Sequence, residues 1–215
     1  MNLNQNINDF SLIEEIWHSI THGVGLALSI AGLAVLVAFA SLDGSVMKIV
    51  SVSVYGATLI MMYGSSTLYH AISHPNIKRL FQKFDHAAIY FLIAGTYTPV
   101  TLVAMADNWG WAIFFTEWFI ALIGISLKFL YPGRFEILSL IFYLLMGWLI
   151  VIAIDPLSAT LTSTGTWLLV LGGLSYTLGV FFYVKDYKPF YHAIWHLFVL
   201  AGSVFHYFMI LLYVI

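Results

Sequence analysis

The sequence predicts an all-α, polytopic membrane protein built as a bundle of seven transmembrane helices. Three observations predict it. The 215 residues are 61% hydrophobic and only 8% charged, whereas soluble globular domains carry about 25% charged residues. Seven apolar stretches have the length of a membrane-spanning helix, and the connections between them are short. A water-soluble fold is excluded, because such a chain has too little polar surface to cover one.

The seven stretches follow one another with turn-forming sequences between most of them. A helix needs about 20 predominantly apolar residues to cross the hydrocarbon core. Runs near that length lie at 23–42, 49–69, 87–106, 109–127, 137–154, 160–184 and 189–215. The fourth contains one acid, Glu117, and the last is longer than a span requires. We expect one membrane domain over residues 1–215, with a short polar or interfacial segment over 1–20.

The orientation of the spans follows from lysine and arginine in the short connections, which are enriched on the cytoplasmic side. Seven of the eight basic residues fall on the side of the N-terminus: Lys78, Arg79, Lys83, Lys128, Arg134, Lys185 and Lys188. The opposite side has only Lys48. We therefore predict a multi-pass protein of the cell membrane with its N-terminus in the cytoplasm and its C-terminus outside.

Composition also limits the partners and the ligand chemistry. The chain has no cysteine, which excludes disulfides and thiolate metal ligands. A net charge of −2 and the lack of a basic patch argue against nucleic acid as a partner. Membrane lipids are the expected partners.

Polar residues from three distant stretches meet at one predicted membrane depth. His70 ends the second run, Asp85 opens the third, and His192 and His196 open the seventh, all on the cytoplasmic side. His192 and His196 are spaced i, i+4, so on a helix both rings project from one face and can bind one ion. Ser66 lies one turn before His70 and is expected to be its hydrogen-bonding neighbour.

This set of residue types favours a metal centre. Three histidines with water in the fourth position form an open zinc site of the catalytic type, and zinc lowers the pKa of that water to about 7. Asp85 would then hold the water or act as a general base. Two other interpretations stay open: hydrogen bonds between helices for the histidines, and a helix N-cap for Asp85.

The stretches SSTLYH, FDHAAIYFLIAGTYTP and HAIWHLFVLAGSVFH resemble the signature sequences of the haemolysin III branch of the progestin and adiponectin receptor family. The resemblance extends from THGVG at residue 21 to the last span. It implies a seven-helix bundle that binds zinc within the membrane through His70, His192 and His196, with Asp85 and Ser66 beside the zinc-bound water. The family belongs with ceramidase-like membrane proteins associated with hydrolysis of lipid amides or esters.

Four further residues are left with alternatives. His18 and His22 would form an interfacial helix face or close over the mouth of the metal site. His206 lies about 15 Å along the helix from His196, too far to share an ion, so a polar contact or a role in a substrate cavity is expected. Glu117 would line a cavity or make a hydrogen bond between helices.

Three functions are compatible with these residues. The first is a zinc-dependent hydrolase of a lipid amide or ester at the cytoplasmic leaflet. The second is a non-catalytic protein of membrane homeostasis, in which a structural zinc joins helices and the lipid state is sensed. The third is a haemolysin, which is weaker physically because a secreted pore-former must be soluble before it inserts and no export signal is seen.

Overall fold

The computed structural model describes residues 10–42, 44–106 and 108–215, with the side chain of Asn108 excepted. These residues form helices and no strand. The helices are α1 (Leu12–Ser41), α2 (Val46–Ala71), α3 (Pro75–Pro99), η1 (Val100–Ala104), α4 (Asn108–Leu130), α5 (Glu136–Trp148), η2 (Leu149–Ala153), α6 (Ile154–Thr160), α7 (Ser163–Val184) and α8 (Tyr191–Tyr213). Seven helical segments of the described chain are long and apolar enough to span a membrane, which confirms the predicted fold class.

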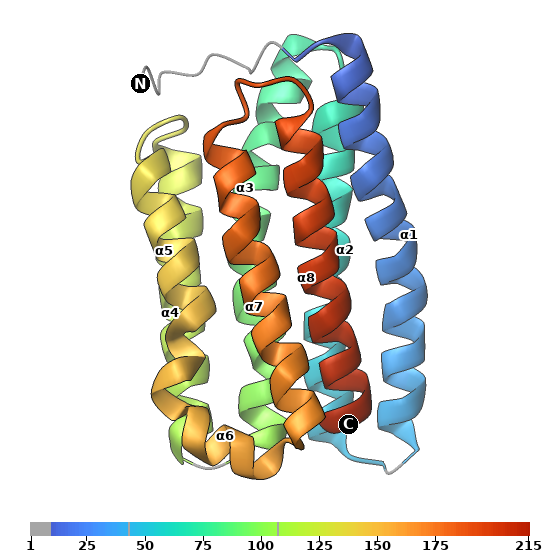
Figure 1. Ribbon diagram of the computed structural model, residues 1–215, viewed down its shortest axis with the longest axis vertical. Coiled ribbons are helices and arrows are strands. Elements are labelled where there is room, and N and C mark those ends of the chain that lie inside the picture. Colours follow the sequence, from blue (N-terminus) through green and yellow to red (C-terminus); the bar gives the residue numbers. More distant parts are fainter. Residues whose placement is uncertain (1–9, 43, 107) are drawn as a thin grey trace.

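The seven spans run side by side as one bundle (Figure 1). α1 packs on both α2 and α8, α2 packs on α3, and α3 packs on α4, while α7 lies against α8 and α5. The start of α1 and the C-terminus of α8 lie at opposite ends of the bundle (Figure 1), as an odd number of spans requires. The orientation of these two ends in a membrane stays a prediction.

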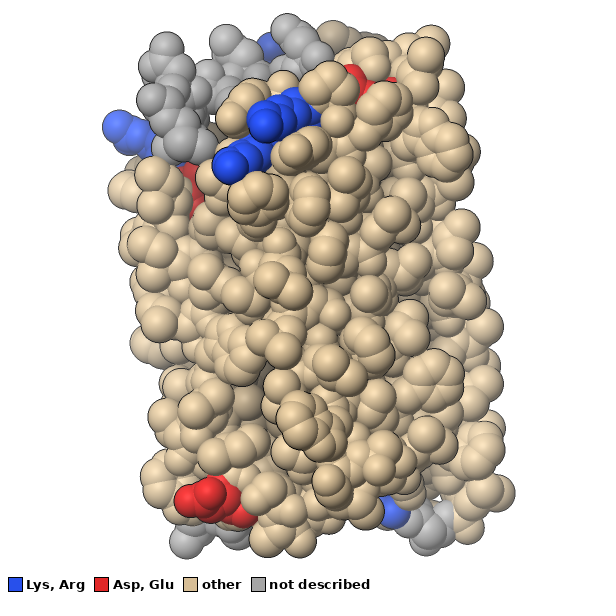
Figure 2. Space-filling view, viewed as in Figure 1, with Lys and Arg blue, Asp and Glu red and all other residues tan. Residues whose placement is uncertain are grey.

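The surface and the interior divide as expected for a protein surrounded by lipid. Charged residues gather near the two ends of the visible face, and the broad middle carries none (Figure 2). Large apolar side chains such as Phe39, Phe119 and Leu145 are exposed. Close helix contacts inside depend on small residues, as is common in membrane bundles. A Cβ atom on Gly95 of α3 would lie only 2.1 Å from Thr58 Oγ1 of α2.

Two helices begin well before the predicted runs, because their first turns are polar. α1 starts after Ser11, which forms a capping box with Glu14. α3 starts with Pro75 in its first turn, a favoured position for proline. Asp85 therefore lies inside α3, whose N-cap position is occupied by His74. The N-cap interpretation of Asp85 is wrong.

Proline also shapes the far end of the third span. The α-helical part of this span ends at Pro99 and continues as the π-helical segment η1. Proline removes a backbone hydrogen bond and disturbs the preceding turn, and Thr98 and Thr101 donate their hydroxyl hydrogen bonds to backbone carbonyls there. The wider turn at η1 is the local result.

Candidate metal centre

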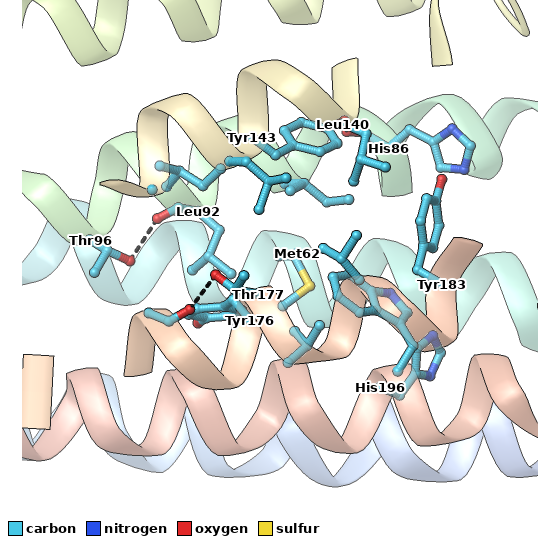
Figure 3. Close-up of a pocket in the computed structure, with 18 of the residues that line it drawn as sticks. Met62, His86, Leu92, Thr96, Leu140, Tyr143, Tyr176, Thr177, Tyr183 and His196 are labelled. Atoms are coloured by element: carbon cyan, nitrogen blue, oxygen red, sulfur yellow. Dashed lines mark hydrogen bonds between the residues drawn. The ribbon is translucent and has the colours of Figure 1, made fainter. Parts of the chain in front are cut away.

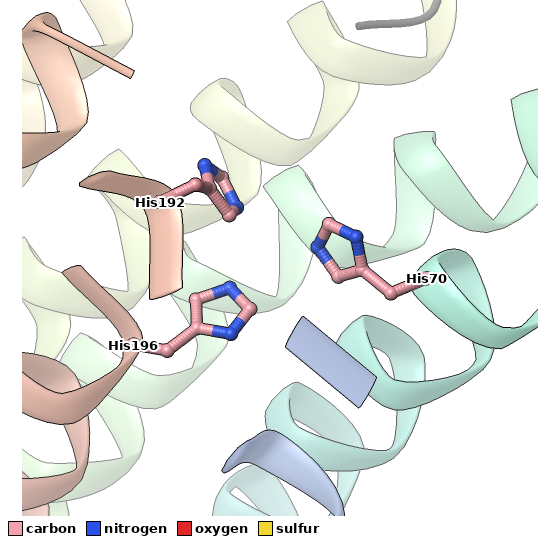
Figure 4. A group of neighbouring side chains, drawn as sticks. All are labelled: His70, His192 and His196. Carbon is pink, nitrogen blue, oxygen red and sulfur yellow. The ribbon is translucent and has the colours of Figure 1, made fainter. Parts of the chain in front are cut away.

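Three histidines from two helices face one another at the end of the bundle where α1 begins. His70 lies at the end of α2, and His192 and His196 lie in the first turns of α8. All three are buried, and each offers a nitrogen within 4.8 Å of those of the other two. Figure 4 shows the three rings directed into one shared space. The structure thus brings together all three predicted ligands.

The chain turns sharply to place the two histidines of α8. Phe190 precedes the helix in a left-handed conformation, with φ of +62°. Its backbone N–H donates to Glu14 Oε1 at 2.9 Å, which ties the start of α8 to the start of α1. From this start, the i, i+4 spacing presents His192 and His196 on the inner face.

Neighbouring polar groups orient the rings of His70 and His196. His70 Nδ1 lies 2.6 Å from Glu15 Oε2, and Glu15 Oε1 lies 2.8 Å from Lys78 Nζ. The His196 Nδ1 atom lies 3.0 Å from Thr21 Oγ1. Because a carboxylate can only accept, His70 carries its proton on Nδ1 and presents the lone pair of Nε2.

The unused nitrogens fit a bound metal ion. His70 Nε2 is buried and has no hydrogen-bond partner among the described residues. His192 Nδ1 lies 3.6 Å from Asp186 Oδ2, an arrangement that directs Nε2 of this ring toward a metal. A buried polar atom without a partner costs free energy, which a metal bond would offset. Neutral imidazole is the metal-binding form. It suits zinc, and also copper, iron and nickel, so the donor set is compatible with zinc without identifying it.

Asp85 and Ser66 lie beside two of the three histidines. Both line one cavity together with His22, His192 and His196. The expected bond between Ser66 and His70 is not formed: Ser66 Oγ lies 2.7 Å from His22 Nδ1 instead. That His22 ring stacks on His196 with 3.5 Å between ring centroids. Ser66 is therefore connected to the cluster through α1.

The first helix contributes Glu15, which the sequence interpretation did not consider, together with His18 and His22, for which closing over the mouth of the metal site was one of two alternatives. Glu15, His18 and His22 project from one face of α1 at a spacing of three and four residues. His18 and His22 are buried, so the interpretation of an interfacial helix face is wrong. The i, i+3, i+7 spacing was the available signal, but the polar residues before it suggested a segment outside the bundle.

The cavity extends from the histidines into the middle of the bundle. Its volume is about 130 Å³. Apolar side chains such as Met62, Leu92 and Leu140 line its length, as Figure 3 shows. His196 and His86 stand at one end of this view, and Thr96 lies toward the other. His86 and His196 thus lie at one end of a mostly apolar chamber.

The other polar residues lie apart from the three histidines. His206 Nε2 lies 3.1 Å from the Leu169 carbonyl oxygen, and the side chain also lines the cavity. His74 is exposed. Glu117 is fully buried, yet its carboxylate has no hydrogen-bond partner in the described part of the chain. It is not among the residues lining the cavity beside the histidines.

Comparison with known proteins supports the resemblance noted above. The family model described as "Haemolysin-III related" matches residues 10–207. The chain is 45% identical to "Hemolysin-3" of Bacillus cereus over 202 residues, which cover 94% of this chain and 92% of that protein. It is 46% identical to "Hemolysin-3 homolog" of Bacillus subtilis (strain 168), with 95% and 96% covered. It is 32% identical to human "Monocyte to macrophage differentiation factor", with 88% and 80% covered.

Proposed function

Because the chain belongs to the haemolysin-III-related family, we propose that it is a zinc-binding membrane protein that hydrolyses an amide or ester bond of a lipid at the cytoplasmic leaflet. The observation that carries this proposal is the position of the histidine group. Two of the three grouped histidines, His192 and His196, line an apolar cavity together with the carboxylate of Asp85 and the hydroxyl of Ser66. The amide or ester linkage of a lipid would lie at the end of the cavity beside these polar residues, and its acyl chain would lie along the apolar length.

His70, His192 and His196 would hold the zinc ion. When bound, zinc polarises a carbonyl oxygen and makes water a stronger nucleophile. Asp85, which lines the same cavity as His192 and His196, would accept the proton of the attacking water and return it to the leaving nitrogen or oxygen. Ser66, whose Oγ lies 2.7 Å from His22 Nδ1, would orient the attacking water or donate a hydrogen bond to the developing oxyanion.

The apolar part of the cavity would bind the acyl chain and exclude bulk water from the bond that is cleaved. Its lining is supplied by α2, α3, α5, α7 and α8, so the acyl chain of the lipid would lie among the spans and parallel to them. Exclusion of water strengthens electrostatic interactions at the reacting end. The shape also explains how a hydrolase could act on a molecule that never leaves the bilayer.

The test is lipid turnover by purified protein in liposomes. We would supply a ceramide and a diacylglycerol with labelled acyl chains and measure the free fatty acid released. Asp85→Asn should retain zinc and fold and lose turnover by about 100-fold or more, the usual contribution of a general acid–base residue. Glu117→Gln is the matched control, since it neutralises a buried acid away from the histidines. Equal turnover by Asp85→Asn and wild type would exclude the hydrolytic role of Asp85.

A non-catalytic zinc protein is the second candidate. It is favoured by the burial of the group, because a metal ion held by these ligands would join the end of α2 to the start of α8. In that case zinc removal would lower the thermal stability while neither lipid is cleaved. The names of the two Bacillus relatives point to haemolysis as a third candidate. Lysis of erythrocytes by the purified protein at nanomolar concentration would favour it.

A further inference from the structure

We propose that His18 of α1 supplies a fourth imidazole to the metal centre, so that the resting site is closed by four histidines. This inference rests on the zinc site of the proposed function and specifies its state. It concerns a residue that the three-histidine interpretation leaves without a role. If it holds, the first helix controls access to the ion.

The buried ring nitrogens of His18 need a bonding partner. Its side chain has no exposed surface, and neither ring nitrogen has a hydrogen-bond partner among the described residues. The nearest carboxylate oxygen, Glu15 Oε2, is 3.9 Å from Nδ1, too long for a hydrogen bond. Two buried nitrogens without partners are unfavourable. A metal bond at one of them and a shortened contact to Glu15 at the other would satisfy both.

The positions of the rings match four ligands around one ion. The centroid of His18 lies 4.7 Å from that of His70, 4.8 Å from that of His192 and 5.4 Å from that of His196. The other three rings lie 5.2, 5.2 and 4.7 Å from one another. Tetrahedral zinc with Zn–N distances of about 2.0–2.1 Å holds imidazole centroids roughly 5 Å apart. His18 therefore lies at the spacing of a fourth ring. A nitrogen of His18 already groups with one of His70, and a rotation of the His18 ring toward His192 and His196 would complete the set.

Glu15 is better placed to orient ligands than to be one. Its Oε2 atom lies 2.6 Å from His70 Nδ1, and its Oε1 atom lies 2.8 Å from Lys78 Nζ. A nitrogen of His18, a nitrogen of His70 and an oxygen of Glu15 also lie within 4.8 Å of one another. The carboxylate thus faces the Nδ1 atoms of two imidazoles, the arrangement that directs Nε2 of each toward a metal.

Closure by four protein ligands has a chemical consequence. Structural zinc sites are closed, whereas catalytic sites keep a position for water or substrate. Phe10 packs against His18 and His192, with ring centroids 4.7 and 5.0 Å apart, which adds an apolar cover. Hydrolysis would require His18 to leave the ion, and replacement of His18 by a shorter residue would open the site permanently.

The experiment counts imidazole ligands in the full-length protein. X-ray absorption of the zinc-loaded wild type should give four imidazoles, and that of His18→Asn should give three with one oxygen. In the cobalt-loaded proteins, azide should leave the visible spectrum of the wild type unchanged and shift that of His18→Asn in a saturable way. His22→Asn is the control for loss of a buried histidine from the same helix, and it should retain four imidazoles.

The outcomes separate this inference from the proposed function. Bound zinc with three imidazoles, together with a wild-type cobalt spectrum that azide shifts, would overturn the fourth ligand and leave the proposed function intact. A wild type that binds no metal would overturn both. If His18→Asn does not fold, the imidazole count and the azide response of the wild type still decide.

Discussion

Replacement of Glu15 by glutamine should weaken zinc binding without removing a ligand. Glu15 accepts from His70 Nδ1 at 2.6 Å and from Lys78 Nζ at 2.8 Å. The neutral amide keeps the size of the side chain but loses the charge that holds the His70 tautomer. Loss of such an outer partner of a metal-binding histidine typically lowers affinity about 10- to 100-fold. That corresponds to about 1.4–2.8 kcal/mol of binding free energy.

Zinc affinity can be measured by competition with a chromophoric chelator, using protein in detergent and free of other metals. Glu14→Gln is a close control, because the neighbouring acid bonds instead to Ser11 and to the Phe190 backbone N–H. We expect its zinc affinity to stay within about twofold of wild type, as for a residue that touches no ligand. Equal affinities of wild type and Glu15→Gln, or an equal loss in Glu14→Gln, would refute the role of Glu15.

Three further predictions concern packing, the cavity and the orientation. Gly95→Ala should lower the free energy of unfolding in detergent by about 1–3 kcal/mol, because the added Cβ atom would collide with Thr58. Gly147→Ala is the control and should change thermal stability little, because a Cβ atom there has no neighbour within 4 Å. Gly173→Leu should fill part of the cavity lining and shift the bound acyl chains toward shorter ones, measured by mass spectrometry of lipids extracted from the purified protein; unchanged chain lengths would count against an acyl site. Because the chain has no cysteine, Lys188→Cys and Ser158→Cys can each be labelled alone in intact cells with a membrane-impermeant maleimide. Only Ser158→Cys should react, and the reverse pattern would invert the predicted orientation.

The spans could be predicted from the sequence because a helix inside the membrane must consist mainly of apolar residues. Every backbone polar group in lipid must be satisfied within the segment, so long apolar runs correspond to helices. The starts of α1 and α3 could not be predicted in the same way. Their first turns carry Glu14, Glu15 and Lys78. A search for uncharged runs begins each helix after such residues, so it misses the turns in which Glu15 pairs with Lys78.

The candidate site was predictable in part for a related reason. The i, i+4 spacing of His192 and His196 is local, and the depth of His70 follows from the topology. The contribution of α1 is not local, because the partners of Glu15 and His22 are His70 and Ser66, far along the chain. The same packing explains the error over Ser66, whose hydroxyl turns to α1 rather than along α2.

The zinc content of the purified protein, measured by elemental mass spectrometry, tests the central claim most directly. The comparison is between wild type and His192→Ala/His196→Ala, with the exposed His74→Ala as a control for unspecific binding to histidine. We expect about one zinc per chain in wild type and in the control, and little in the double variant, because a site with two ligands removed cannot complete its coordination. Wild type without zinc, or a double variant that retains it fully, would contradict the metal centre at the end of α2 and the start of α8.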